Sequence, residues 1–208
     1  MALSDLYSNF QLLFRWLHVL AGIIWIGHLY FFNFVNVPLQ ATLDDPTKKL
    51  INPKLMPRAL FWFRWGAMLT FIMGLVLFTQ IYMYTPGQGF GPSQLFSGPD
   101  GLTGRALWIL FGMLLGTIMW FNVWFIIWPA QKAMLSGKIA ADKLPAVRKR
   151  AFLASRANTF LSAPMLFGML APSHYGGINP LTAIVAIGLG VIAIWHFIKI
   201  SHKAGATI

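Results

Sequence analysis

The sequence contains no cysteine, no glutamate and few charged residues of any kind. Without cysteine the chain has no disulfide, no CxxCH haem attachment, no cysteine-ligated iron–sulfur cluster and no thiol catalysis. Charged residues make up 10% of its 208 residues, whereas a soluble domain has about a quarter. Because so few charges cannot cover a globule, the lipid bilayer is expected to solvate much of the chain.

Acidic residues are also missing from the apolar parts of the sequence. All five acidic residues are aspartates that fall outside the long apolar runs: Asp5, Asp44, Asp45, Asp100 and Asp142. A proton- or sodium-coupled transporter usually needs a carboxylate within the membrane. This absence, and the lack of a clear internal repeat, weigh against a transporter.

Five apolar segments are present, each near the ~20 residues that cross a bilayer as a helix. They span residues 11–36, 60–84, 104–128, 157–173 and 180–200. The fourth is the weakest, because it is short and contains Pro164. The sequence therefore predicts an all-α integral membrane protein, with a single domain over residues 1–208 formed by a bundle of about five transmembrane helices.

Most of the basic residues behind the net charge of +11 lie in alternate connections. Basic residues gather in 37–59, in 129–156 and in the C-terminal tail, whereas 85–103 and 174–179 contain none. Positive loops stay in the cytoplasm, so the pattern predicts the N-terminus outside and the C-terminus inside, in a bacterial inner membrane. The basic excess is thus a topology signal, and nucleic acid is not expected as a partner. Within 129–156, residues 142–156 are expected to form either an amphipathic helix on the inner surface, with Asp142 as a candidate N-cap, or a solvated connector.

Histidines are the residues best suited to chemistry inside this bundle. With a rise of ~1.5 Å per residue, the predicted helices place them at two depths. His18 and His174 lie toward the outside, and His28 and His196 toward the inside. Neutral imidazole is the usual axial ligand of a b-type haem held between helices. All four are therefore candidate haem-iron ligands, and the second pair would add a second haem.

Neighbouring residues fit an outer haem. Gly22, one turn after His18, leaves room for a flat macrocycle on the same helix face. Arg15 and Arg105, both near the outer rim, are positioned to pair with haem propionates. The alternative for each histidine is a structural hydrogen bond or simple solvation, and His202 is expected to be solvated. Arg64 is expected to extend toward the lipid headgroups.

Asn33 and Asn122 lie inside apolar segments that contain no nearby charge. Amide side chains in such positions form hydrogen bonds between membrane helices. We expect this structural role for both residues.

Three stretches resemble the membrane domain of the membrane-bound urate hydroxylase family, also called the urate oxidase N-terminal domain family. They run from Arg15 to Asn33, from Asn122 to Lys132, and from Asn158 to Tyr175. The resemblance implies a membrane protein tied to electron transfer, with haem, and it favours His18 and His174 as ligands. Family members that oxidise urate are longer and carry a C-terminal c-type cytochrome domain. This sequence has no CxxCH, so a c-type partner would be a separate chain.

The leading hypothesis is a haem b-binding membrane subunit that carries electrons within a redox enzyme or respiratory complex. Its partners would be the lipid bilayer and other membrane or c-type cytochrome subunits. One alternative is a cofactor-free structural subunit of a larger membrane complex. Another is a membrane oxidoreductase acting on a small organic substrate such as urate, or on a quinol near the outer rim. The catalytic residues of such an enzyme are not evident in the sequence.

Overall fold

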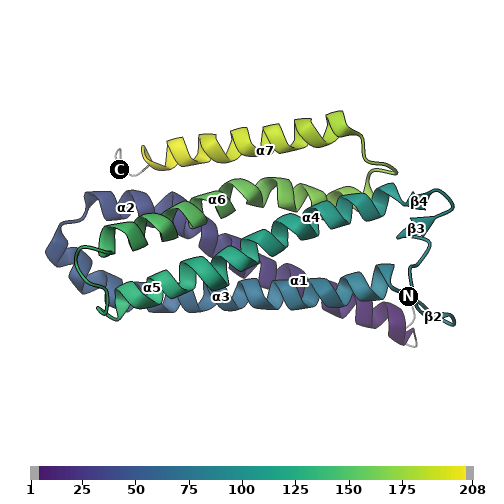
Figure 1. Cartoon of the computed structure of the whole chain (residues 1–208), viewed down its shortest axis with the longest axis horizontal. Coiled ribbons are helices and arrows are strands. Elements are labelled where there is room, and N and C mark those ends of the chain that lie inside the picture. The colour runs from purple at the N-terminus through teal and green to yellow at the C-terminus, as the bar shows by residue number, and fades with distance from the viewer. Residues whose placement is uncertain (1–4, 205–208) are drawn as a thin grey trace.

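A computed structural model describes residues 5–204, which form five long helical stretches lying alongside one another (Figure 1). The first stretch joins α1 (Leu6–Tyr30), the π-helical η1 (Phe31–Asn36) and α2 (Val37–Thr42), and the second is α3 (Asp45–Tyr82). The third joins α4 (Gly104–Phe121), the π-helical η2 (Asn122–Ile127) and α5 (Trp128–Leu135). The fourth is α6 (Leu144–Leu170) with the 3-10 turn η3 (Ala171–Ser173), and the fifth is α7 (Pro180–Ser201). The predicted all-α membrane bundle is confirmed.

The segment between α3 and α4 contains two short antiparallel hairpins. β1 (Tyr84–Thr85) pairs with β2 (Gly89–Phe90), and β3 (Ser97–Gly98) pairs with β4 (Gly101–Leu102). Gly89 and Gly101 have φ values of 91° and 105°. Glycine adopts this left-handed region without a steric penalty, which accounts for the glycine-rich composition of these turns.

Side-chain caps fix where several helices begin. Asp44 accepts a hydrogen bond from the backbone N–H of Thr47 at the start of α3, and Thr103 accepts one from Ala106 at the start of α4. The Thr47 hydroxyl and backbone N–H lower the pKa of the Asp44 carboxyl. Such caps satisfy backbone donors that have no partner inside the helix.

The helices are longer at the basic end than the apolar segments predicted. Residues 37–42 and 45–59, expected in a connection, are helical, and α3 continues through Pro53 and Pro57. Residues 144–156 form the first part of α6 and not a separate surface helix. Asp142 does not cap this helix, because α6 begins after Lys143 and has no side-chain cap. Hydropathy marks the part of a helix that lipid surrounds, and these helices extend beyond it.

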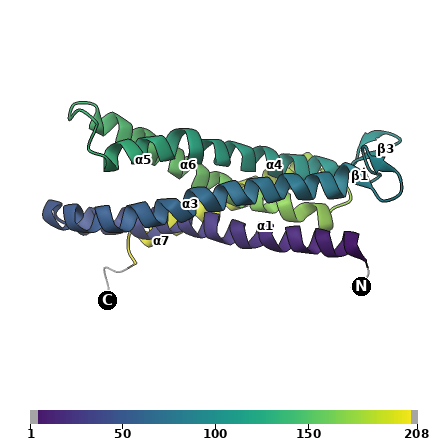
Figure 2. The ribbon, with the colours of Figure 1, turned by 90° about the horizontal axis from the view of Figure 1, so that it is seen from below.

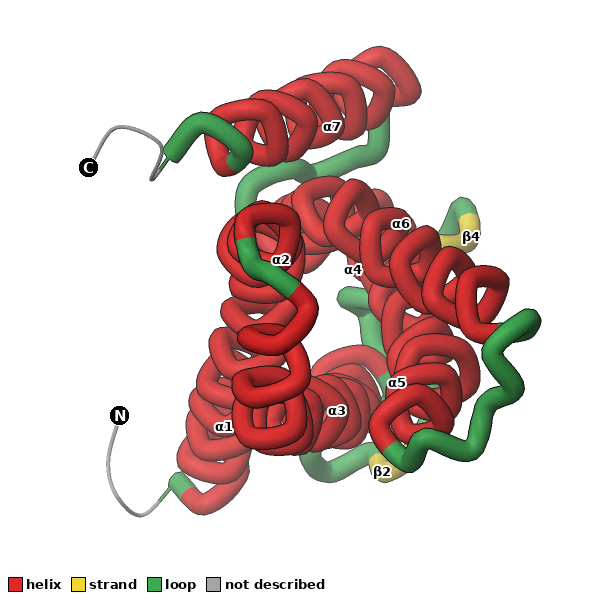
Figure 3. Tube along the Cα trace, turned by 90° about the vertical axis from the view of Figure 1, so that its left-hand side faces the viewer, coloured by secondary structure: helices red, strands yellow, loops and turns green. Residues whose placement is uncertain are grey.

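Two helical hairpins and one outer helix make up the bundle. α1 packs along α3, α4 packs along α6, and α7 lies on the outside against α6 and η1 (Figures 1 and 3). The N-terminal end of α1, the two β-hairpins and the α6–α7 connection lie at one end, which we call the outer end (Figure 2). The α2–α3 and α5–α6 turns and the C-terminal end of α7 lie at the other end (Figure 1). The basic connections therefore gather at one end, as the predicted topology requires.

Four of the five stretches are long and apolar enough to cross a membrane, and α6 is the exception. Its first half carries Arg148, Lys149, Arg150 and Arg156. Yet α6 contacts α4, α7, η1 and η2, so it lies within the bundle. Asn158, Thr159 and Ser162 of α6 are fully buried by the protein itself. Such a helix needs less hydropathy than one that faces lipid.

Pro164, which weakens the fourth apolar segment, lies inside α6 and is buried. A side chain added at Gly190 of α7 would come within 3.3 Å of the Pro164 ring and 3.1 Å of Ala163. The proline thus lies where α7 approaches α6 closely. Other helices barely cover the rest of α7, since 6% of the residues in its most apolar stretch are buried.

Candidate functional site

His18 lies in the seam between α1 and α3. Its Nδ1 is 2.8 Å from the backbone carbonyl oxygen of Thr70, and its side chain is half-buried. Gly74, one turn further along α3, makes room for the ring. A Cβ added at Gly74 would lie 3.0 Å from His18 Cε1 and 3.4 Å from Nδ1. The imidazole therefore occupies space that any other residue at position 74 would fill.

The hydrogen bond to Thr70 fixes the chemistry of the His18 ring. A carbonyl oxygen only accepts, so Nδ1 carries the proton in the neutral ring and Nε2 keeps a free lone pair. Histidines that bind metals commonly have this arrangement, with the second ring nitrogen held by a carbonyl or carboxylate. His18 is thus oriented and has the tautomer that an Nε2 ligand requires.

His28 has the same arrangement within a single helix. Its Nδ1 is 2.7 Å from the carbonyl oxygen of Ile24, one turn earlier, and the side chain is half-buried. Nε2 is again the nitrogen available to a ligand. His196, its predicted partner, is exposed on α7. α7 meets the first helical stretch at η1, where the Phe34 and Phe197 rings are 6.2 Å apart.

His174 lies at the outer end, in the turn that follows η3. Its side chain is exposed and its backbone N–H donates to Ala171. The next residue, Tyr175, lies against the Trp108 ring of α4, with ring centroids 6.0 Å apart. The Trp108 indole N–H donates to the carbonyl oxygen of Gly177 at 3.1 Å. The His174 turn is therefore anchored to α4.

The structure does not bring His174 to His18. The outer half of α1 packs on α3, whereas η3 packs on α4, and Figures 1 and 3 show the outer ends of α1 and α6 on different sides of the bundle. No hydrogen bond joins two of the histidines in residues 5–204, and no group of three or more histidine or acidic side chains is close enough to bind one metal ion there.

The other predicted cofactor residues divide between the same two places. Gly22 lies on the seam of His18, where an added Cβ would be 3.9 Å from the Thr70 methyl group. Arg15, on the outer half of α1, is exposed. Arg105 begins α4 beside the His174 turn, since an added Cβ at the preceding Gly104 would clash with Gly177 at 2.2 Å. The Nε of Arg105 is buried without a partner in the described structure, so this guanidinium still has a donor to offer.

Arg64 of α3 does not simply extend toward headgroups. Its guanidinium carbon lies 3.8 Å from the ring centroid of Trp128 on α5, a cation–π contact. Its Nε is buried and has no partner among the described residues.

Polar side chains of α6 bond to Asn33 of the first hairpin and to Asn122 of the second, to which α6 itself belongs. The Asn33 amide donates to Ser155 at 2.9 Å, and the Asn122 amide donates to Asn158 at 2.8 Å. Asn158 in turn donates to the carbonyl oxygen of Met119 at 2.9 Å. The predicted interhelical bonding is confirmed. The sequence did not indicate that both asparagines belong to π-helical turns, which are frequent near functional sites.

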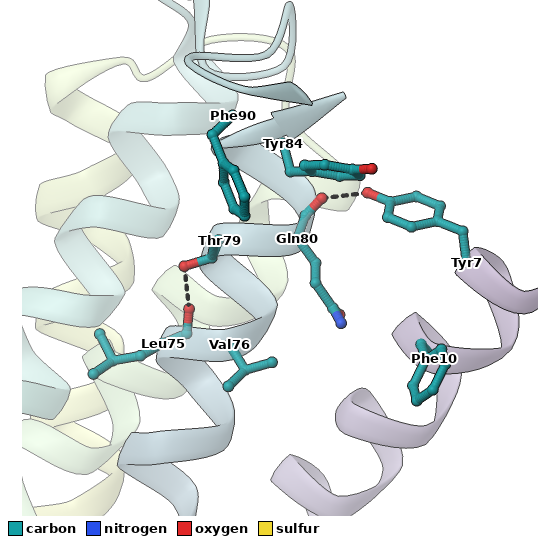
Figure 4. A pocket seen from close by; sticks show the side chains of 8 residues that line it. All are labelled: Tyr7, Phe10, Leu75, Val76, Thr79, Gln80, Tyr84 and Phe90. Atoms are coloured by element: carbon teal, nitrogen blue, oxygen red, sulfur yellow. Dashed lines mark hydrogen bonds between the residues drawn. The ribbon is translucent and has the colours of Figure 1, made fainter. Parts of the chain in front are cut away.

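A pocket that the sequence did not indicate opens at the outer end of the α1–α3 seam (Figure 4). Its volume is about 510 Å³. Its lining comes from α1, from the last turns of α3 and from the β1–β2 hairpin: Tyr7, Phe10, Leu75, Val76, Thr79, Gln80, Tyr84 and Phe90. The Tyr7 hydroxyl donates to the backbone carbonyl of Gln80 and ties α1 to α3 there.

The pocket and His18 lie on one face of α1. Tyr7 and His18 are 11 residues apart, which corresponds to about 16 Å of rise and about 20° of rotation. Tyr7 meets the carbonyl of Gln80 and His18 meets that of Thr70. Two side chains of α1 thus bind backbone carbonyls of α3 in the outer half of this antiparallel seam.

Comparison with known protein families gives a match to the model described as "urate oxidase N-terminal", over residues 90–208. The match covers α4, α6 and α7 and includes His174 and Arg105, but it does not reach His18. Comparisons with curated proteins and with solved structures give no match. The family relates the chain to oxidoreductases. Because more than half of the chain matches, the protein belongs to the urate oxidase N-terminal family.

Proposed function

We propose that this protein is a haem b-binding membrane subunit that carries electrons within an oxidoreductase or respiratory complex. The observation that carries the proposal is the half-buried His18, whose Nδ1 is held by a backbone carbonyl while Nε2 stays free. Membership of an oxidoreductase-related family supports it.

The chain's residues fit one axial ligand better than a ready-made pair. His18 would bind the iron through Nε2, with Gly22 leaving space on the same seam. His174 remains the predicted second ligand, with Arg105 beside it as a partner for a propionate. The present arrangement keeps these two places apart, so His174 could bind the same haem only if α1 and the α4–α6 hairpin approached. The Nδ1–carbonyl bond of His28 supports a second haem less strongly, because His196 is exposed.

Haem iron would supply reversible one-electron transfer, and the protein would supply ligation, orientation and a low-dielectric setting. The Thr70 carbonyl holds the His18 ring and, by accepting from Nδ1, makes Nε2 a stronger ligand. Since the carbonyl belongs to the backbone of α3, this support depends on the α1–α3 packing and not on a side chain. Partners with c-type haem or further membrane subunits, and a bacterial inner membrane, belong to the same proposal.

The visible spectrum of the purified, dithionite-reduced protein tests this function. We expect the α-band and the Soret band of a b-type haem. His18→Ala should remove them and His174→Ala should weaken or remove them, whereas His202→Ala, in the exposed tail, should not. A protein that folds and shows no haem band would contradict the proposal.

A cofactor-free structural subunit is the second candidate, and the surface of α7 favours it. Most large apolar side chains of α7 are exposed, including Leu181 at 67% and Ile184 at 66%. A face of this kind suits another membrane chain as well as lipid. In this case the His18–Thr70 bond would serve only to join two helices. The haem spectrum separates the two functions. A third candidate is oxidation of urate by the protein itself. It predicts that addition of urate reduces the haem iron, so that the bands of reduced haem appear without dithionite.

A further inference from the structure

The pocket at the outer end of the α1–α3 seam has the size and the lining of a small-molecule site. Its volume of about 510 Å³ falls in the usual range for such sites, roughly 300–1,000 Å³. Three separate elements line this open pocket, so it forms only when α1, α3 and the β1–β2 hairpin come together (Figure 4).

Aromatic rings dominate one side of the pocket. The Tyr7 and Tyr84 rings have centroids 5.7 Å apart, and those of Tyr84 and Phe90 are 5.3 Å apart. With Phe10 they offer a surface on which a flat aromatic ring can stack. Phe90 is 83% exposed, so its ring is free to cover a ligand.

A polar atom without a partner lies in the same pocket. The Gln80 side chain extends from α3 into the space that faces α1 (Figure 4). Its Oε1 is buried and accepts no hydrogen bond from the described residues. A buried acceptor left without a donor costs free energy, and rotation of the amide toward the pocket would let a ligand O–H remove that cost. The Tyr84 hydroxyl takes part in none of the hydrogen bonds described for residues 5–204, so it offers a second polar contact.

The pocket mouth is apolar and lies where lipid is expected. Phe10 is 53% exposed and Leu75 is 44% exposed, and both belong to membrane-spanning stretches. A ligand with a long apolar tail could therefore leave the pocket along α1 and α3 into the outer leaflet. An apolar opening toward lipid does not favour the entry of a small water-soluble substrate.

From these features we infer that the pocket binds the head group of a lipid-soluble quinol. The aromatic side chains stack on its ring, Gln80 Oε1 accepts from a quinol hydroxyl, and the tail passes between Phe10 and Leu75. The oxidised quinone has only acceptor oxygens, so it gains nothing from Oε1. This site goes beyond the proposed haem function and does not depend on it, because binding requires no haem.

The test is anaerobic titration calorimetry on the purified full-length protein in detergent. The probes are a quinol with a ten-carbon tail, its quinone, an alcohol with the same tail, and urate. We expect saturable binding of one quinol per chain, tighter than binding of the quinone and much tighter than that of the alcohol. Loss of one buried hydrogen bond corresponds to about a tenfold loss of affinity. Gln80→Leu should therefore weaken quinol binding about tenfold.

Two variants guard this result. Gln94→Leu changes an exposed glutamine of the same loop region outside the pocket and should bind quinol as the unaltered protein does. Val76→Trp fills the pocket from α3 and should abolish quinol binding. Gln80→Leu keeps the backbone carbonyl that Tyr7 binds, so its fold should survive. Wild-type affinity in both pocket variants, equal affinity for the alcohol, or displacement of quinol by urate would each overturn the inference.

Discussion

At the scale of single residues, α3 holds the His18 ring, whereas the turn that carries His174 is anchored to α4. The rise per residue gives each histidine a depth. His18 lies in the N-terminal half of α1 and His174 directly follows η3, so both lie toward the outer end, as that depth predicts. Depth says nothing about which helices are adjacent. His18 therefore meets Thr70 and Gly74 of α3, whereas His174 is anchored beside α4. Only the three-dimensional arrangement shows that the His18 ring packs against the backbone of Gly74, where a side chain would leave too little space.

Gly74→Ala tests the fit of the His18 ring. The added methyl would lie 3.0 Å from His18 Cε1, so the ring must move away from the Thr70 carbonyl or the helices must separate. Overpacking of this kind costs about 1–3 kcal/mol, measured by chemical unfolding in detergent. Gly27→Ala is the control, because nothing lies within 4 Å of its added Cβ. Equal stability of the two variants would argue against a close fit of the His18 ring to Gly74.

At the scale of helices, hydropathy located the helices and the asparagines indicated how they join. Asn33 and Asn122 were expected to bridge helices because amides in lipid need partners, and both do so through α6. The π-helical turns were beyond prediction. Each lies in a first helix of a hairpin, η1 before Val37-Pro38 and η2 before Trp128-Pro129. In both hairpins, the first helical stretch therefore contains a π-helical turn that is followed by a proline. The apolar residues around these turns differ between the hairpins, so the sequence shows no clear repeat.

Asn158 is the residue of α6 on which one hairpin depends. It is fully buried, accepts from Asn122 and donates to the carbonyl oxygen of Met119. Asn158→Leu would leave the Asn122 amide without this partner and remove one of the donors to the Met119 carbonyl, which also accepts from the Asn122 backbone N–H. It should lower the unfolding free energy by about 1–3 kcal/mol. The same unfolding titration measures it. Thr117→Val, which removes only an exposed hydroxyl bonded to its own helix, should change little. A neutral Asn158→Leu would mean that this contact does not hold the hairpin.

At the scale of the whole molecule, the charge of the connections predicts which of them lie together at one end of the bundle. The segments rich in lysine and arginine lie at the end with the α2–α3 and α5–α6 turns, and the uncharged hairpins lie at the other (Figure 1). The sequence could not predict how far other helices bury α7, because a helix surrounded by lipid and one surrounded by protein have similar apolar sequences. Its exposed face is the natural place for a further subunit.

The absence of cysteine allows a direct test of topology. Gln88→Cys, at the tip of the β1–β2 hairpin, and Lys138→Cys, in the α5–α6 turn, would each carry the only thiol of the chain. In intact cells, a membrane-impermeant thiol reagent should label position 88 and spare position 138 until the cells are opened. Labelling of position 138 in intact cells would show that the α5–α6 turn faces the outside and would contradict the predicted orientation.

The most direct test of the central claim is the ratio of haem b to protein in the purified chain, compared with that of His18→Ala and His202→Ala. The account predicts that His202→Ala keeps the full ratio and that His18→Ala, while still folded as a helical protein, loses its haem. A protein without haem b, or a His18→Ala variant that retains the full ratio, would contradict it.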